Sequence, residues 1–165
     1  MHGSIFKTTW GWFGVLASEA GLRRTCLPMA GRQDVEAFFS ADSTETPRPD
    51  RVVDPGVELI RAYFQGIRVD FLEVPVDLNG FSPFERRVLD VLRSVGYGQT
   101  VSYTDLAALA GRPKAVRAVA NAVAKNPLPL IIPCHRVLRK DGSLGGFSAP
   151  GGVMIKKRLL ALECE

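Results

Sequence analysis

The sequence lacks any long uninterrupted apolar run. No stretch approaches the roughly 20 residues that a membrane-spanning helix needs, and the start of the chain lacks the basic and apolar regions of a signal peptide. Cysteine is also scarce: Cys26, Cys134 and Cys164 are odd in number and show no C-x-x-C spacing, which fits neither a disulfide scaffold nor a common zinc site. We therefore expect a soluble, cytoplasmic protein in a reducing compartment, with no membrane partner and no metal.

Charge is unevenly distributed along the 165 residues. Residues 1–81 contain 8 Lys and Arg against 11 Asp and Glu, a net charge of −3, whereas residues 82–165 contain 13 against 6, a net charge of +7. A basic half attracts phosphate groups, so nucleic acid is a candidate partner. Charge alone leaves a merely solvated surface equally open.

The first half shows strand patterns followed by a helix and a polar loop. Residues 5–10, 12–18 and 22–27 are strand-like and are separated by Gly11 and by Ala20-Gly21, which predicts an antiparallel meander. Asp54 and Pro55 are typical of the N-cap and first position of a helix. The elements predicted after the meander are a helix over 32–39, a loop over 40–55, a helix over 55–64 and a strand within 69–78.

The second half changes to a helical period. The predicted helices cover residues 82–95, 102–110 and 113–125. Leu106 and Leu109 are expected to face a core, and Gly111 is expected to end the second helix. The last two helices, joined by this turn, are a helix-turn-helix candidate. We therefore predict an α/β protein, with a small N-terminal α/β domain (antiparallel sheet plus helix) over 1–76 and a mostly helical domain over 77–165.

The third predicted helix has faces of different character. The positions expected to face the core at helical spacing are Val116, Val119, Ala120 and Val123. The polar stripe consists of Lys114, Arg117, Asn121 and Lys125. The small residues between the two stripes are Ala115, Ala118 and Ala122. Such a helix could approach a nucleic-acid groove closely, but a solvated polar face on a good helix former explains the same pattern.

An apolar run interrupted by prolines ends in Cys134, His135 and Arg136. A cysteine is a nucleophile only as a thiolate, which a nearby base or cation stabilises, and His135 and Arg136 could supply those roles. Adjacent side chains in an extended strand point apart, so a turn or a bridging water is needed. An inert core cysteine is the alternative, but two polar groups after Pro133 are costly in a buried strand unless they are used. Cys26 has no such neighbours, so we interpret it as structural.

The motif Pro133-Cys134-His135-Arg136-Val137 resembles the signature of the O6-alkylguanine-DNA alkyltransferases, the methylated-DNA-protein-cysteine methyltransferase family. The likeness covers about residues 81–163 well and the first half more weakly. Further segments that look like the family's, in the same order, are Tyr97-Gly98-Gln99-Thr100-Val101-Ser102-Tyr103, Ala115-Val116-Arg117-Ala118-Val119 and Asn126-Pro127. The last two are similar to the recognition helix and the hinge of the family.

The resemblance implies a suicide DNA-repair protein that moves an alkyl group from O6 of guanine in duplex DNA to Cys134. The damaged base has to be flipped out of the stack, because the O6 substituent is unreachable within it. The product is a thioether without an easy hydrolytic exit, which implies one turnover and no external cofactor. A non-catalytic lesion-binding DNA module and a Cys-His hydrolase are the alternatives.

The resemblance also implies roles for particular residues. Cys134 would accept the alkyl group, His135 would act as base through water with Glu163 as its partner, Tyr103 would donate a proton and help rotate a phosphate, and Asn126 would organise the hinge. Arg117 would take the place of the extruded nucleotide. The other residues implied to contact DNA are Tyr103, Lys114, Ala115, Ala118, Asn121 and Arg136. The residues implied to line the substrate pocket are Pro129, Val137, Phe147, Ser148 and Ala149.

Two features depart from the family pattern. Phe147 stands where the family often has tyrosine, and the segment 148–152 is longer than in some relatives, which leaves the range of adducts open. Some relatives hold zinc in the first half, where this chain has only Cys26 and His2, too few for a closed site. We expect a monomer, able to bind cooperatively along DNA, and leave open whether it also acts on O4-alkylthymine.

Overall fold

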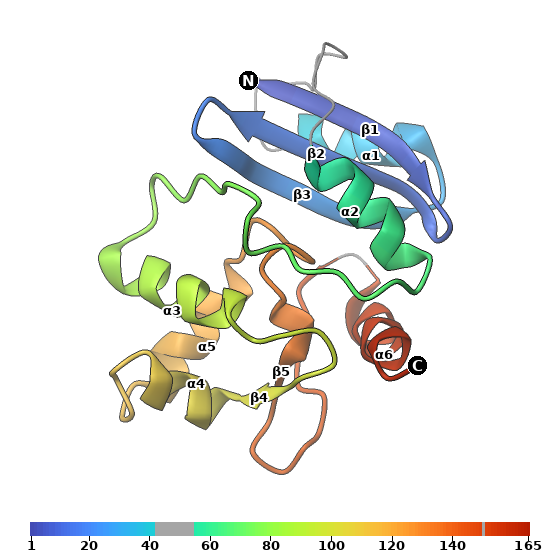
Figure 1. The fold of residues 1–165 in the computed structure, drawn as a ribbon. Coiled ribbons are helices and arrows are strands. Elements are labelled where there is room, and N and C mark those ends of the chain that lie inside the picture. The colour runs from blue at the N-terminus through green and yellow to red at the C-terminus, as the bar shows by residue number, and fades with distance from the viewer. Residues whose placement is uncertain (42–54, 150) are drawn as a thin grey trace. The chain divides into compact units, whose positions relative to one another are not determined.

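The computed structural model describes residues 1–41, 55–149 and 151–165. The chain forms two compact units, Met1–Asp77 and Leu78–Glu165. Figure 1 labels the helices and strands of both units.

The first unit is built on an antiparallel meander of β1 (His2–Thr8), β2 (Gly11–Ser18) and β3 (Gly21–Met29), as predicted. Tight turns are possible because Gly11 and Gly21 have φ values of 132° and 144°. A Cβ atom on Gly11 would lie 2.5 Å from the carbonyl oxygen of Met29, so no other residue fits there without a shift.

Helices α1 (Arg32–Ser40) and α2 (Pro55–Phe64) pack on this sheet (Figure 1). Alternating strand positions contact different helices. The backbone of Gly14 comes so close to α1 that a Cβ atom would lie 2.4 Å from the ring of Phe39. The neighbouring Phe13 instead packs against Phe64 of α2, with the ring centroids 5.9 Å apart and the rings tilted. The sheet is therefore buried on both faces, each covered by one helix.

The predicted strand within residues 69–78 is wrong. This segment forms turns and one isolated parallel bridge between Leu22 and Val76. Leu22 donates its N–H to Pro75 and accepts from Asp77, so the backbone of the segment pairs with β3 only around Leu22. Pro75 has no N–H with which to continue a ladder. The predicted N-cap Asp54 and nearly all of the predicted loop 40–55 lie outside the described residues.

The second unit contains three packed helices, α3 (Pro83–Arg93), α4 (Tyr103–Leu109) and α5 (Val116–Ala124). Ser82 caps α3, with Glu85 completing a capping box. Gly111, at φ 78°, ends the turn after α4, so the helix-turn-helix is present as predicted (Figure 1). The buried side chains that these helices share are Val88, Leu89, Leu92, Leu106, Val119 and Val123.

Three details of the helix-turn-helix differ from the sequence prediction. Leu109 is 62% exposed rather than facing the core. Helix α5 begins at Val116 instead of residue 113, because residues 112–115 close a turn in which Ala115 donates to the Arg112 carbonyl. Ala122 is buried, so it cannot face a groove as the sequence suggested.

The remaining elements of this unit position the cysteine motif. Strand β4 (Val101–Ser102) pairs in parallel with β5 (Val137–Leu138). Strand β5 directly follows a 3-10 turn, η1 (Cys134–Arg136), which contains the cysteine. The last helix, α6 (Gly152–Glu163), packs on η1. Sequence analysis assigned no helix here, yet α6 supplies two side chains of the site.

Candidate active site

Asn126 holds the turn that leads to Cys134. Its side chain donates to the carbonyl of Ile132 at 2.8 Å and accepts from the N–H of Leu128 at 2.9 Å. Between them Leu130 adopts a φ of 78°, unusual for a residue other than glycine, Asn or Asp. The turn is buried throughout residues 130–137, so the backbone before Cys134 is fixed by hydrogen bonds rather than by a regular strand.

Cys134 lies at the first position of η1 and is buried. Burial raises the pKa of its thiol, while the hydrogen bond with Asn126 and the charge of Lys156 act in the opposite direction without reversing the shift. The resting group is therefore a thiol at neutral pH. Because the nucleophile is the thiolate, a base has to take the proton during the reaction.

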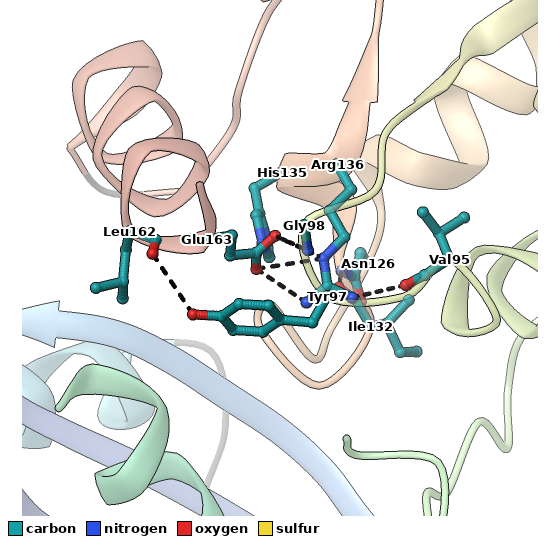
Figure 2. A network of polar contacts seen from close by, with 9 residues as sticks. All are labelled: Val95, Tyr97, Gly98, Asn126, Ile132, His135, Arg136, Leu162 and Glu163. Atoms are coloured by element: carbon teal, nitrogen blue, oxygen red, sulfur yellow. Dashed lines mark hydrogen bonds and ion pairs between the residues drawn. The ribbon is translucent and has the colours of Figure 1, made fainter. Parts of the chain in front are cut away.

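His135 and Arg136 converge on one carboxylate, that of Glu163 at the end of α6 (Figure 2). His135 Nε2 lies 2.7 Å from Glu163 Oε1. Arg136 donates from Nε at 3.0 Å to Oε2 and from Nη2 at 2.9 Å to Oε1. The N–H of Gly98 also donates to Glu163 Oε2, at 3.3 Å. One carboxylate thus joins α6, the cysteine turn and the segment before the helix-turn-helix.

The network fixes which nitrogen of His135 carries a proton. A carboxylate only accepts, so Nε2 must donate to Glu163 and the lone pair of a neutral ring lies on Nδ1. That Nδ1 is buried and has no hydrogen-bond partner among the residues that the structure describes. His135 is therefore prepared to accept a proton at Nδ1.

Burial sets the ionisation states of this network. It lowers the pKa of His135 despite the opposing effect of Glu163, so the ring is neutral at pH 7. Burial alone would raise the pKa of Glu163, but hydrogen bonds from His135 and Arg136, together with their charges, hold it at about 2. Glu163 is consequently an anion ready to stabilise a protonated His135.

Arg136, which the sequence predicted to contact DNA, lies inside the protein with its donors directed at protein acceptors. Its side chain is buried, and its third donor, Nη1, reaches the carbonyl of Val95 at 2.6 Å. The guanidinium also faces the ring of Tyr97 at 6.0 Å. Arg136 therefore orients Glu163 and ties the cysteine turn to the end of α3.

Lys156 is a site residue that sequence analysis missed. It is 0% exposed, and its Nζ donates to the carbonyls of Val137, at 2.7 Å, and Leu144. Burial lowers its pKa, and the negative charge of a Cys134 thiolate would oppose that shift. Lys156 thus bridges two points of the loop after Cys134. This role could not be predicted from the sequence, because it depends on the position of α6 beside that loop.

Tyr103, the first residue of α4, lies within electrostatic reach of Cys134. Burial raises the pKa of its hydroxyl, and the Cys134 charge raises it further, while Arg139 acts in the opposite direction. The structure thus brings together the predicted catalytic residues Cys134, His135, Glu163, Asn126 and Tyr103 within one unit.

The predicted pocket residues are spread along the loop between β5 and α6 and the turn before Cys134. Val137 is buried and gives its carbonyl to Lys156, whose Nζ lies 5.9 Å from the ring centroid of Phe147. Ser148 instead donates to Ala124 at 3.2 Å, which links the loop to the end of α5. Pro129 and Ala149 are both partly exposed.

The exposed face of α5 carries Arg117, Ala118 and Asn121. Lys114 is exposed in the turn before the helix, and Ala115 is its N-cap. Lys125, by contrast, is held in an ion pair. Its Nζ lies 2.6 Å from Glu85, and the hydrogen bond from Lys125 lowers the pKa of that carboxyl to about 2.

Within residues 1–41, 55–149 and 151–165, no group of three His, Cys, Asp or Glu side chains could hold a metal ion. Across the same residues, no helix combines the length and apolar character needed to cross a bilayer.

The second unit therefore presents a buried cysteine, with its own proton acceptor, close to a helix-turn-helix. Residues 83–165 match the family described as 6-O-methylguanine DNA methyltransferase, DNA binding domain. The chain is 42% identical over 144 residues to the methylated-DNA--protein-cysteine methyltransferase of Mycolicibacterium paratuberculosis, covering 83% of this chain and 85% of that protein. The chain belongs to this family, so the resemblance seen in the motifs is confirmed.

Other relatives extend the comparison. The Methanothermobacter thermautotrophicus protein of the same name is 42% identical over 76% of this chain, and the mouse protein 43% identical over 75%. The chain spans just under two thirds of their lengths, 66% and 65% respectively. The crystal structure of Mycobacterium tuberculosis OGT in complex with DNA superposes with a TM-score of 0.79 at 30% identity, covering 99% of this chain and 93% of that one. This likeness confirms the predicted fold class.

Proposed function

We propose that this protein repairs DNA by irreversible transfer of an alkyl group from O6 of guanine to Cys134. The observation that carries the proposal is the buried Cys134 thiol in one turn with His135, whose Nδ1 is unprotonated and whose Nε2 is held by Glu163. The relative solved in complex with DNA supports DNA as the partner. No external cofactor is needed, because nucleophile and base both belong to the chain.

The reaction begins with proton removal from Cys134. A bridging water carries the thiol proton to His135 Nδ1, and Glu163 stabilises the resulting imidazolium through Nε2. Lys156 offsets the negative charge that develops on sulfur, because the two groups interact electrostatically. The thiolate exists only while it is being consumed, which keeps the resting protein unreactive towards other electrophiles.

The sulfur then attacks the alkyl carbon, a C–S bond forms and the C–O6 bond breaks. The departing guanine takes a proton from the Tyr103 hydroxyl, whose raised pKa keeps it protonated until then. The proton held on His135 restores Tyr103, so the thiol proton ends on guanine overall. The thioether has no acyl carbon for water to attack, and one protein molecule therefore repairs one lesion.

Duplex DNA would be bound by the exposed face of α5. The small side chain of Ala118 allows close approach to a groove, while Arg117 and Asn121 are positioned to contact bases or backbone. We propose that Arg117 occupies the space of the flipped nucleotide. We further expect a monomer that binds cooperatively along DNA, and sedimentation with oligonucleotides of increasing length tests this expectation.

The test is incubation with a duplex containing one O6-methylguanine, followed by analysis of both products. We expect unmodified guanine in the DNA and one additional methyl group on the protein. Tight binding without transfer would favour a lesion-binding module instead, and repeated turnover on an ester would favour a Cys-His hydrolase. Action on O4-methylthymine is tested in the same way with the corresponding duplex.

A further inference from the structure

The pairing of β4 with β5 brings two residues from distant parts of the chain to the same place. Val101 pairs with Val137 and Ser102 with Leu138 in parallel register. The next residues, Tyr103 and Arg139, therefore leave the pair side by side at the same end.

The side chains of Tyr103 and Arg139 also converge on one point. A Cβ atom built on Gly145 would lie 3.5 Å from Cγ of Arg139, 3.6 Å from Cε2 of Tyr103 and 3.7 Å from Nε of Arg139. Gly145 has a φ of 68°, so glycine both fits the backbone and leaves room for the two side chains. Tyr103 and Arg139 thus form a mixed aromatic and cationic surface over Gly145.

The turn after Arg139 fixes the backbone of this arginine by hydrogen bonds. Arg139 donates its N–H to Ser143 and accepts from Gly142, both at 2.9 Å. Asp141 accepts from the N–H and the hydroxyl of Ser143 at 2.9 and 2.6 Å. These hydrogen bonds lower the pKa of Asp141, so it is an anion, but its carboxylate is held by Ser143 rather than by Arg139.

Arg139 is exposed and makes no ion pair with a carboxylate of the described residues. Its charge is nonetheless felt by the site: it lowers the pKa of both Tyr103 and Lys156, although burial is the larger influence on each. This guanidinium therefore differs from that of Arg136, whose donors are taken up inside the protein. An available guanidinium offers a fork of donors that matches two phosphate oxygens.

We propose that Arg139 is a phosphate-binding residue that, together with Tyr103, holds the backbone of the nucleotide presented to Cys134. This inference rests on the proposed repair function. A flipped base keeps its covalent connection to the duplex, so its flanking phosphate must turn towards the protein. A phosphate over Gly145 would lie against the ring of Tyr103 and meet the guanidinium of Arg139 from one side. Arg139 would then contribute to duplex repair without touching the reacting atoms.

The experiment compares Arg139→Gln with Lys157→Gln, which removes the same charge from an exposed position of α6. Affinity for an unmodified duplex is measured over a range of salt concentrations, and transfer is measured from an O6-methylguanine duplex and from free O6-benzylguanine. For Arg139→Gln we expect the slope of log affinity against log salt to become shallower by about 1, as for loss of one phosphate contact. Duplex repair at low protein concentration should fall by about tenfold, and transfer from the free base by less than about threefold.

Further variants and outcomes sharpen the test. Arg139→Lys should restore part of the salt slope, because it retains charge without the planar fork. Equal salt slopes for Arg139→Gln and Lys157→Gln would overturn the proposal. Arg139 would then contribute only to the overall positive potential of the protein. Equal losses on duplex and free base would overturn it as well, because they would place the effect inside the pocket. If the wild-type protein accepted no alkyl group, the repair function would fail, while the salt slopes would still decide the role of Arg139.

Discussion

Cys26 and Cys134 are both buried, yet their surroundings give the two sulfur atoms different chemistry. Cys26 lies in β3 against Leu16, Val35 and Phe39, and burial raises its pKa to about 12. Burial raises the pKa of Cys134 too, but this sulfur lies next to His135 in a polar turn and within reach of the Lys156 charge. The difference teaches that a buried cysteine becomes useful when a proton acceptor is folded in beside it, not when its resting thiol is acidic.

Replacing each cysteine in turn tests this difference between Cys26 and Cys134 and should give the largest effect. Cys134→Ala should abolish alkyl uptake, because the acceptor atom is gone. Cys26→Ala should leave uptake intact and lower the free energy of unfolding by about 1 kcal/mol, since only a small side chain is lost from the core. Mass spectrometry of the protein after reaction and chemical denaturation measure the two effects. Alkylation of Cys26 in the Cys134→Ala variant would contradict the distinction.

The second-largest effect is expected from Glu163→Gln, which removes the charge that stabilises protonated His135. The transfer rate from free O6-benzylguanine should fall by about a hundredfold, within the range for losing assistance to a general base. An unchanged rate would show that the His135–Glu163 contact is structural only. Single-turnover kinetics with the fluorescence-labelled free base measure the rate.

The same variant has a pH-dependent effect on stability. The pKa of Glu163 in the folded protein, about 2, is below its ordinary value of 4.5, so its stabilisation is present above pH 4.5 and is lost as pH falls towards 2. Glu163→Gln also leaves the Arg136 guanidinium buried without its anion, which costs about 3 kcal/mol at pH 7. Urea unfolding at pH 7 and pH 3 should show this deficit shrinking at the lower pH. A deficit that grows on acidification would contradict the ion pair.

Lys156→Met tests whether the lysine makes the surroundings of Cys134 different from those of Cys26. Removing the buried cation should raise the pKa of Cys134 further, so transfer at pH 7 should slow by about tenfold and recover partly as pH rises. Lys157→Met, on the exposed side of α6, is the matched control and should leave the pH profile unchanged. A uniform loss at every pH would point to loop disorder instead of electrostatics.

The smallest effect is expected from Phe147→Tyr, which restores the hydroxyl common in the family. The Phe147 ring already packs near Lys156 Nζ, at 5.9 Å from its centroid, and is partly exposed, so the added group can reach solvent. We expect a change of less than about threefold in methyl transfer, comparable to one exposed hydrogen bond. Competition between methyl and benzyl substrates measures any change in adduct preference.

Local signals predicted the parts of the fold whose causes are local. Ser82 and Glu85 form the capping box that starts α3, Gly111 ends the turn after α4, and Gly11 and Gly21 occupy the hairpins of the meander. The failed strand over 69–78 carries a similar pattern, but its contact with Leu22 depends on how the segment folds back on β3. Leu109 likewise follows the apolar period of α4 and is nevertheless exposed.

The candidate site was predictable where motif and chemistry coincide, and less so where distant segments meet. Cys134, His135 and their neighbours stand together in the sequence. The direction of Arg136 is set by Glu163, 27 residues further on, and could not be read from the motif itself. Lys156 stands beside Lys157 and Arg158 in the sequence, and only its partners Val137 and Leu144, in a loop that returns to α6, distinguish it from them. The protonation of Cys134 depends on burial, which only the folded turn defines.

The most direct measurement of the central claim is a titration of the protein with excess O6-methylguanine duplex, read by intact mass and by peptide mapping. The account predicts that uptake stops at one methyl group per protein molecule and that this group is located on Cys134. A folded protein that leaves Cys134 unmodified, or that continues to release methyl groups over many cycles, would contradict it.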